Sequence, residues 1–502
     1  MLYSIIFSNF VAETIKYKMK NFLPRTFLLT LIVVAILLGL YYLPPITFSG
    51  SIGSWFGWSP SSNNGGSLRQ VDLLGDLRDK KATEAQQIDT KLLKSLENKE
   101  AEKEAAADSA FHDTVKAPAE MIKIVDYGDN TLMGMAPFYE ALNHVKQRPV
   151  RIAFLGDSFV EGDILTGDLR AMLQQHFGGC GVGWMDITSQ TAGFRQTVTH
   201  TYNNWDSYSY QDRHKFSRKL QGIDKRYYQP RFGAWVDGKC SHYAFGNDHC
   251  ANTSLFFIAK NGANLNLQIN QNDTFNFHAD ASPDLQMLTH KGPIKRARWN
   301  VDKANGAYFY GMAMDGSNGI ILDNFSMRGN SGTQLSNIPD EWLAKFNQER
   351  PYDLIVIQFG LNVVTKMRED YNFYKKDMMR VIEHLHKAFP QAGILVISVG
   401  DRAYRADDGE MSPMPGAKNL SIYQQSLAAD AKVAFWNLHD AMLAQGGMAE
   451  MVKAKPSLAN LDYTHINFRG GKVMAQKLYE ALLFGKGQYD RRKAFTLKKR
   501  NE

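Results

Sequence analysis

The chain has 502 residues, of which 44% are hydrophobic and 22% charged, a balance typical of a folded protein with a sizeable core. The formal net charge is +7, but the excess of Lys and Arg lies before the first apolar segment and after Lys486. Because the chain between these ends is close to neutral, we predict no nucleic-acid partner. The 3 cysteines match no metal-ligand spacing, so no metal site and no cofactor are predicted. Whether Cys240 and Cys250 form a disulfide stays open.

An almost wholly apolar run from Phe27 to Leu43 follows a basic segment and precedes two prolines. Its length suits a bilayer crossing, and the basic residues on its amino side place the N-terminus in the cytoplasm. We therefore predict a cytoplasmic basic segment over 1–26 and a single-pass transmembrane anchor over 27–45, with the rest of the chain across the membrane. A signal peptide that begins at Met19 and is cleaved is the alternative, which the lack of a small-x-small cleavage site disfavours.

Residues 46–116 lack the pattern of a folded domain. The segment from Ser49 to Ser67 is rich in Ser, Gly and Asn, which indicates a flexible tether. From Leu68 to Ala107 the residues favour a helix but supply few apolar positions, which predicts a solvated helical spacer. A coiled coil with a second chain is the alternative, so the oligomeric state stays open.

A first globular segment, residues 117–190, centres on the apolar run from Val150 to Leu155. Its length and branched side chains predict a buried parallel strand, and Gly156 predicts a sharp turn directly after it. Because Ile164 to Phe177 has the periodicity of a helix, Ser158 is expected at the carboxyl end of the strand. Open α/β sheets bind their ligands at that edge.

The segment that follows changes character. A glycine-dense loop from Gly178 to Gly183 lacks the residues of a phosphate-binding loop, so we predict that it shapes the rim of a pocket. Residues 191–318 alternate apolar and polar positions between Asn, Asp and Gly turns, which predicts an inserted β-rich domain, a sandwich. Five of its aromatic residues are predicted either to stack on sugars or to fill its core: Trp205, Tyr208, Tyr210, Trp235 and Trp299.

Strands and helices alternate again in residues 319–485, which predicts a parallel sheet covered on both faces and interrupted by the insertion. The predicted strands are Gly319 to Phe325, Leu354 to Gln358, Ile394 to Ser398 and Lys432 to Leu438. The predicted helices are Asp370 to Phe389, Asn419 to Asp430 and Gly471 to Leu483. The remaining residues, 486–502, are predicted to form a basic tail, in which Lys498-Lys499-Arg500 is interpreted as disordered.

Polar motifs follow these strands and are expected at the same edge of the sheet as Ser158. A serine hydroxyl needs a base within hydrogen-bond reach to act as a nucleophile, and His465 is the candidate. Asp462 is expected to hold the other imidazole nitrogen. Backbone N–H groups of Ser158 and Gly332 and the side-chain amide of Asn362 are the predicted oxyanion donors. These residue types suit acyl transfer.

Two other groups of residues are predicted to have no catalytic role. Glu161 and Asp163 are interpreted as a charge pair at a helix N-terminus rather than as the acid and base of a glycosidase. His384 and His386 lie two positions apart in a predicted helix and therefore face different sides, so they are not expected to share a metal ion.

The order and spacing of the motifs resemble the SGNH (GDSL-like) hydrolase superfamily, whose four blocks supply Ser, Gly, Asn and His. The first, third and fourth blocks are Gly156-Asp157-Ser158, Gly360-Leu361-Asn362 and Asp462-Tyr463-Thr464-His465. For the second block the glycine is assigned to Gly332, with Gly329 as second choice, and Phe159 stands where the consensus has Leu. The resemblance implies a flavodoxin-like doubly wound parallel sheet and a Ser-His-Asp acyl-enzyme mechanism, with Asp157 holding the turn.

The residues from Gly162 to Thr166, the glycine-dense loop and the β-rich insertion together resemble the peptidoglycan O-acetylesterases of Gram-negative bacteria. This resemblance implies a serine esterase that removes O-acetyl groups from a cell-envelope glycan, namely the 6-O-acetyl groups of N-acetylmuramic acid. It further implies a carbohydrate-binding-like insertion. Together with the predicted anchor, it places the catalytic domain in the periplasm, attached to the inner membrane. An O-acetyltransferase with the same triad and a deacetylase of another acetylated polysaccharide remain alternatives.

Overall fold

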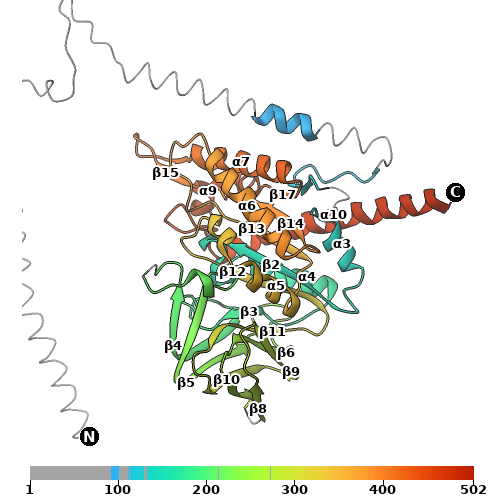
Figure 1. Cartoon of the computed structure of the whole chain (residues 1–502). Coiled ribbons are helices and arrows are strands. Elements are labelled where there is room, and N and C mark those ends of the chain that lie inside the picture. The colour runs from blue at the N-terminus through green and yellow to red at the C-terminus, as the bar shows by residue number, and fades with distance from the viewer. Residues whose placement is uncertain are drawn as a thin grey trace, which may run out of the picture. The chain divides into compact units, whose positions relative to one another are not determined.

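A computed structural model of the chain describes most of the globular region and one segment of the predicted spacer (Figure 1). The described residues are 92–100, 111, 113–128, 133–212, 214–271 and 273–501. The predicted cytoplasmic segment, the predicted anchor over 27–45 and the glycine-rich tether lie outside them. Within these ranges, no helix combines the length and the apolar character that a bilayer crossing requires.

The first sheet has the strand order β1-β17-β14-β13-β2-β12. Its strands are β1 (Val125–Asp126), β2 (Pro149–Gly156), β12 (Gly319–Ser326), β13 (Leu354–Gln358), β14 (Gly393–Ile397) and β17 (Ala434–Trp436). All neighbouring strands run parallel except β1 and β17, which are antiparallel. Strand β1 is not predicted from the sequence because it has only two residues. In chain order the parallel strands are arranged 2-1-3-4-5, so the predicted flavodoxin-like order is confirmed.

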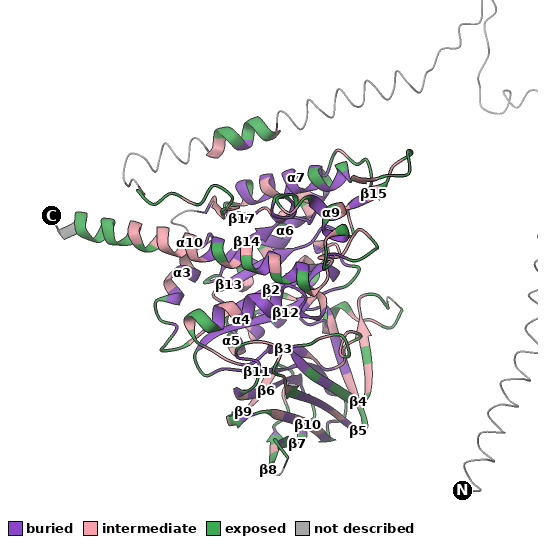
Figure 2. Cartoon of the chain, turned by 180° about the vertical axis from the view of Figure 1, so that it is seen from behind, coloured by how far each residue is buried: buried purple, intermediate pink, exposed green. Residues whose placement is uncertain are grey.

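Helices cover both faces of this sheet, which explains why its central strands β13 and β14 are buried at every position and are almost wholly apolar. The helices are α3 (Ala136–Leu142), α4 (Thr166–Phe177), α5 (Asp340–Glu349), α6 (Asn372–Ala388), α7 (Pro415–Ala431), α8 (Leu438–Leu443), α9 (Gly447–Lys453) and α10 (Phe468–Asn501). Helix α6 packs between α5 and α7 on one face, and α4 packs on α10 on the other (Figures 1 and 2). The strands between them are buried (Figure 2).

The residues between α4 and β12 form the predicted β-rich part. Its strands are β3 (Gly183–Asp186), β4 (Val198–Ser209), β5 (Arg226–Cys240), β6 (Cys250–Ile258), β7 (Ala263–Ile269), β8 (Asp273–Ala279), β9 (Gln286–Ile294), β10 (Arg296–Lys303) and β11 (Tyr308–Asp315). Hydrogen bonds link β4-β5-β10-β7-β8 and β3-β11-β6-β9, and the pair Phe309 with Tyr228 joins the two groups. Because Val236 and Trp299 from one group share a core with Leu255 and Met312 from the other, the groups pack as the two layers of a sandwich.

The β-rich part begins earlier in the chain than predicted. Strand β3 begins at Gly183 rather than after residue 190, because this four-residue strand is recognisable only through its pairing with β11. The glycine-dense loop, which is predicted to shape the rim of a pocket, lies away from Ser158. A Cβ atom on Gly179 would lie 2.7 Å from the backbone of Ile320, so the loop packs against the amino end of β12, whereas Ser158 lies at the carboxyl edge.

The two ends of the described chain are more ordered than predicted. Helix α10 continues to Asn501, so the disordered tail is wrong, and Arg491 pairs with Asp113 at 2.7 Å. The segment 92–100 is helical, and its Leu96 is buried against Ile422 and Ala429, so the spacer is not solvated at this point. Helical periodicity cannot reveal such contacts, because they join segments far apart in the sequence.

Two buried ionic clusters hold the sheet and the β-rich part together. Arg350 pairs with Asp315 of β11 at 2.7 Å and with Asp323 of β12 at 2.6 Å. Asp163 accepts hydrogen bonds from Arg170 of α4 and from Arg195, which precedes β4. Asp163 lies just before the N-terminus of α4, as predicted, but its carboxylate is buried and paired with two arginines, which the sequence does not reveal.

Candidate active site

Ser158 lies at the carboxyl end of β2, where a sharp turn leads into a short 3-10 helix over Ser158–Asp163. Asp157 caps this helix by accepting the N–H of Phe159. The ring of Phe159, the residue after Ser158, is buried and packs beside Gly400. Phe159 thus affects packing, as predicted for this departure from the consensus.

The structure brings Ser158, His465 and Asp462 into one chain of hydrogen bonds. The Oγ atom of Ser158 lies 2.9 Å from Nε2 of His465, and Nδ1 of His465 lies 2.7 Å from Oδ2 of Asp462. The other carboxylate oxygen of Asp462 accepts the backbone N–H groups of Thr464 and His465. In this geometry an imidazole can take the proton of the serine hydroxyl, while the carboxylate fixes the orientation of the ring.

The charge state of Asp462 suits that arrangement. Partial burial raises its pKa, but the hydrogen bonds from the backbone and ring of His465 outweigh burial, and the net pKa lies below its usual value. The side chains remain accessible, with 31% of His465 and 48% of Asp462 exposed. An ionised carboxylate can therefore stabilise the imidazolium that forms when His465 takes a proton.

Asp157 has the structural role that the sequence predicts. Its carboxylate is fully buried and accepts the N–H groups of Phe159, Gly360 and Leu361, so it ties the first motif to the third. Burial raises its pKa to about 6, although the three backbone hydrogen bonds act in the opposite direction. Asp462, and not Asp157, holds the ring of His465.

Two predicted oxyanion donors meet at Asn330, which the sequence analysis did not single out. The amide of Asn362 donates to the backbone oxygen of Asn330 at 2.9 Å, and the N–H of Gly332 donates to the side-chain oxygen of Asn330 at 2.8 Å. One amide hydrogen of Asn362 remains for a ligand, whereas the single N–H of Gly332 is engaged. Gly332 has φ +85°, and a Cβ atom there would lie 2.7 Å from the ring of Phe359, so only glycine fits.

Arg402 is a second residue that the sequence analysis missed. Its Nε atom donates to Oγ1 of Thr464 at 3.1 Å, and the next residue, Ala403, donates its N–H to the oxygen of Tyr463. These bonds anchor the loop that carries Asp462 and His465. The available signal was the polar run Gly400-Asp401-Arg402 directly after a buried strand, where such loops contact a site.

Neither a metal centre nor a disulfide forms part of the site. No group of three or more His, Cys, Asp or Glu side chains that could hold a metal ion is found in the described part of the chain. Nδ1 of His384 lies 3.1 Å from the carboxylate of Asp340. Among the described residues, His384 and His386 belong to no group that could hold a metal ion. Cys180, Cys240 and Cys250 are free thiols in this structure.

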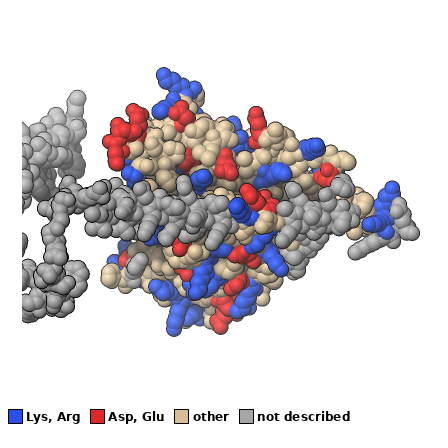
Figure 3. Space-filling model, turned by 90° about the horizontal axis from the view of Figure 1, so that it is seen from above, with Lys and Arg blue, Asp and Glu red and all other residues tan. Residues whose placement is uncertain are grey.

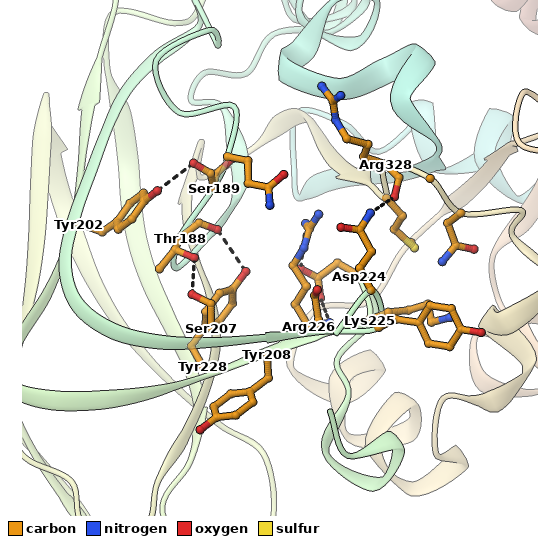
Figure 4. Close-up of a pocket in the computed structure, with 17 residues that line it drawn as sticks. Thr188, Ser189, Tyr202, Ser207, Tyr208, Asp224, Lys225, Arg226, Tyr228 and Arg328 are labelled. Carbon is orange, nitrogen blue, oxygen red and sulfur yellow. Dashed lines mark hydrogen bonds and ion pairs between the residues drawn. The ribbon is translucent and has the colours of Figure 1, made fainter. Parts of the chain in front are cut away.

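A pocket with a volume of about 290 Å³ lies between the β-rich part and the loop Arg328–Asn330 (Figure 4). Tyr208 and Tyr210, two of the aromatic residues considered for sugar stacking, line it. Trp299 instead is buried in the sandwich core, where its Nε1 donates to Thr253. On the face shown in Figure 3, basic and acidic side chains are interspersed.

The sheet order is the one that the resemblance to the SGNH hydrolases implies, and Ser158, His465 and Asp462 lie in one chain of hydrogen bonds at its carboxyl edge. Among solved structures, a peptidoglycan O-acetylesterase matches with a TM-score of 0.59 and 20% sequence identity over 73% of this chain and 99% of that chain. At this identity the match confirms the predicted fold.

Two further structures have lower similarity. A protein described as a GDSL-like lipase from Parabacteroides merdae matches with a TM-score of 0.26 and 17% identity over 32% of this chain and 73% of that chain. A family two carbohydrate esterase from Cellvibrio japonicus matches with a TM-score of 0.24 and 10% identity over 58% of this chain and 98% of that chain. No protein-family model and no curated protein sequence matches the chain.

Proposed function

We propose that the protein is a serine esterase that removes O-acetyl groups from a cell-envelope glycan, namely the 6-O-acetyl groups of N-acetylmuramic acid in peptidoglycan. The observation that carries the proposal is the hydrogen-bonded chain from Ser158 through His465 to Asp462. The fold shared with a peptidoglycan O-acetylesterase supports the choice of substrate. The predicted membrane anchor and a periplasmic location belong to the proposal, since they would bring the site close to that polymer.

In the first half of the reaction, Nε2 of His465 takes the proton of Ser158 while Oγ attacks the acetyl carbonyl carbon. Asp462 keeps the proton of Nδ1 in place and stabilises the imidazolium. His465 then gives the proton to the sugar oxygen, which leaves as the hydroxyl of the glycan. An acetyl ester of Ser158 remains.

In the second half, a water molecule replaces the sugar. His465 takes a proton from the water as it attacks the acetyl carbonyl carbon, and Ser158 leaves with that proton, so acetate is released. The N–H of Ser158 and the free amide hydrogen of Asn362 are the donors to the oxyanion in both halves. The N–H of Gly332 can join them once it is released from the side chain of Asn330.

The test uses purified full-length protein and O-acetylated peptidoglycan, with acetate release as the measurement. Peptidoglycan that has been de-O-acetylated by mild base and the Ser158→Ala variant serve as controls, and neither is expected to yield acetate. Folded wild-type protein that hydrolyses neither the polymer nor a chromogenic acetyl ester would exclude the esterase. Transfer of acetyl groups to added sugar acceptors, without acetate release, would favour the O-acetyltransferase.

A further inference from the structure

The pocket of about 290 Å³ adjoins the catalytic residues without containing them. Its wall includes the loop Arg328–Asn330, and Asn330 accepts the hydrogen bonds of both Asn362 and Gly332. Arg328 forms an ion pair with Glu161, which lies in the same short helix as Ser158. The wall of the pocket and the catalytic site therefore share one loop.

The opposite wall belongs to the β-rich part (Figure 4). Four tyrosines line it: Tyr202, Tyr208, Tyr210 and Tyr228. Between them lie hydroxyl and amide groups from two stretches, 188–190 and 207–211. Tyr228 is buried and the ring of Tyr208 stacks on Tyr227, so Tyr202 and Tyr210 are the rings that a sugar can contact. Such rings beside hydrogen-bonding groups suit a sugar, which offers apolar faces and a rim of hydroxyls, and the volume suits one sugar unit rather than a long glycan.

The charges that line the pocket are predominantly positive. Arg226 is paired with Asp186 at 2.6 Å, and Arg328 with Glu161, so both of these cations have partners. The lining acid, Asp224, is fully buried, and burial together with the nearby charge of Asp186 holds its pKa well above the usual value. The ionised form of Asp224 is therefore disfavoured at this position.

Lys225 is the remaining basic residue of the lining, and burial lowers the pKa of its amine to about 7. Only 2% of the residue is exposed, and its Nζ atom has no hydrogen-bond partner among the described residues. The amine lies 3.5 Å from the centre of the Tyr210 ring, which is a weaker contact than an acceptor would give. Buried polar atoms nearly always have a partner in folded proteins, so an unpaired buried amine in a pocket wall indicates a missing acceptor.

We propose that this pocket, here called the Tyr210 pocket, is a second glycan subsite that binds a carboxylate-bearing amino sugar, with Lys225 donating to the carboxylate. The proposal rests on the proposed function, because it assigns to the same enzyme the acidic sugar of its polymer. Because the pocket and the catalytic site share the loop Arg328–Asn330, a sugar bound in the pocket would position the glycan chain relative to Ser158. This arrangement would also explain why the β-rich part is inserted between the first and second motifs.

Two sugars separate charge recognition from general sugar binding. N-acetylmuramic acid and N-acetylglucosamine share the ring and the acetamide group, and they differ in the lactyl ether with its carboxylate. Both are titrated by calorimetry into the full-length Ser158→Ala protein, so the result does not depend on turnover. We expect N-acetylmuramic acid to bind about 10- to 100-fold more tightly, the value of one hydrogen bond to a charged group.

Lys225→Met is expected to remove this preference, whereas Lys219→Met, at an exposed lysine of the same domain, is expected to retain it. Equal affinity for the two sugars, or an unchanged preference in Lys225→Met, would overturn the proposal. If Lys225→Met does not fold, hydrogen exchange of the Ser158→Ala protein with its native Lys225 replaces it. Bound N-acetylmuramic acid should then protect the stretches 188–190 and 207–211, and protection confined to other segments would contradict the subsite.

The outcome is independent of the acetate-release test. A protein that binds N-acetylmuramic acid as described but releases no acetate would contradict the proposed esterase and leave the subsite standing. A protein that releases acetate but shows no preference between the two sugars would contradict the subsite alone.

Discussion

The Ser158 site and the Arg350 cluster use similar residue types in opposite surroundings. At the carboxyl edge of the sheet, the carboxylate of Asp462 and the ring of His465 are partly exposed. Hydrogen bonds connect the carboxylate to the ring and the ring to the hydroxyl of Ser158. Between the sheet and the β-rich part, Arg350 and Asp323 are almost completely buried, and the guanidinium contacts two carboxylates directly. The first arrangement can pass a proton, whereas the second fixes two parts of the fold.

The comparison also shows what burial does to a carboxylate. Asp323 is fully buried, yet Arg350 holds its pKa below the usual value against the opposing effect of burial. Asp157 is equally buried but has only backbone donors, and its pKa rises to about 6. The guanidinium that bonds directly to Asp323 therefore lowers its pKa where backbone donors alone do not lower that of Asp157, and the predictions below test each side of this contrast.

Replacing the nucleophile should have the largest effect. Ser158→Ala is expected to lower kcat for a chromogenic acetyl ester by at least about 10³-fold, because no other group can form the acyl-enzyme. The control is Ser412→Ala, at a serine on the short strand β16 (Met411–Pro413), and it should leave kcat unchanged. Near-normal turnover of folded Ser158→Ala would remove Ser158 from the mechanism.

Breaking the Arg350 cluster should affect stability instead of chemistry. Arg350→Met leaves Asp315 and Asp323 buried without their cation, so the free energy of unfolding should fall by about 3–5 kcal/mol. Urea denaturation measures this loss, and kcat of the protein that remains folded should be unchanged. Combining Arg350→Met with Asp315→Asn and Asp323→Asn should restore part of the stability, and a further loss would contradict the account.

Removing an oxyanion donor should have an intermediate effect on the rate. Asn362→Ala is expected to lower kcat by about 10²- to 10³-fold with a small change in KM, because the amide acts mainly on the charge that develops during reaction. The matched control is Asn337→Ala, because the amide of Asn337 donates to Gln334 within the 3-10 helix Thr333–Asn337. A change in KM alone would make Asn362 a substrate-binding residue.

The smallest effect concerns the dependence of stability on pH. Because its pKa is raised from 3.8 to about 6, folded Asp157 binds a proton more tightly than the unfolded chain does. Its contribution thus favours folding at low pH, and about 2–3 kcal/mol is lost as the pH rises through this window. Asp157→Asn should remove that slope from urea midpoints measured between about pH 4 and pH 6.5, and an identical slope in both proteins would contradict the raised pKa.

The sequence predicted the features that depend on short, local patterns. Apolar runs marked β2, β12, β13, β14 and β17, and polar motifs after them led to Ser158, His465 and Asp462, which the structure brings into contact. Ser158 follows β2, and the loop with Asp462 and His465 follows β17 after two short helices. Because the carboxyl ends of parallel strands lie at one edge of a sheet, these residues were expected to lie close together.

The missed features depend on contacts between distant segments. Strand β3 is only four residues long and is defined by β11, more than a hundred positions later. The buried partners of Asp163 and Arg350 come from other elements, so the sequence shows only isolated charges there. Asn330 stands out only when Gly332 and Asn362 are seen to donate to the same residue.

The most direct test of the account is to trap the acyl-enzyme. Full-length protein is mixed with an excess of an aryl acetate, quenched in acid within the first turnover and digested for peptide mass spectrometry. We predict one added acetyl group on Ser158, with none at this position in His465→Ala. Full turnover of the ester with no acetyl group on Ser158, or with acetyl on another residue that turns over at the same rate, would contradict the account.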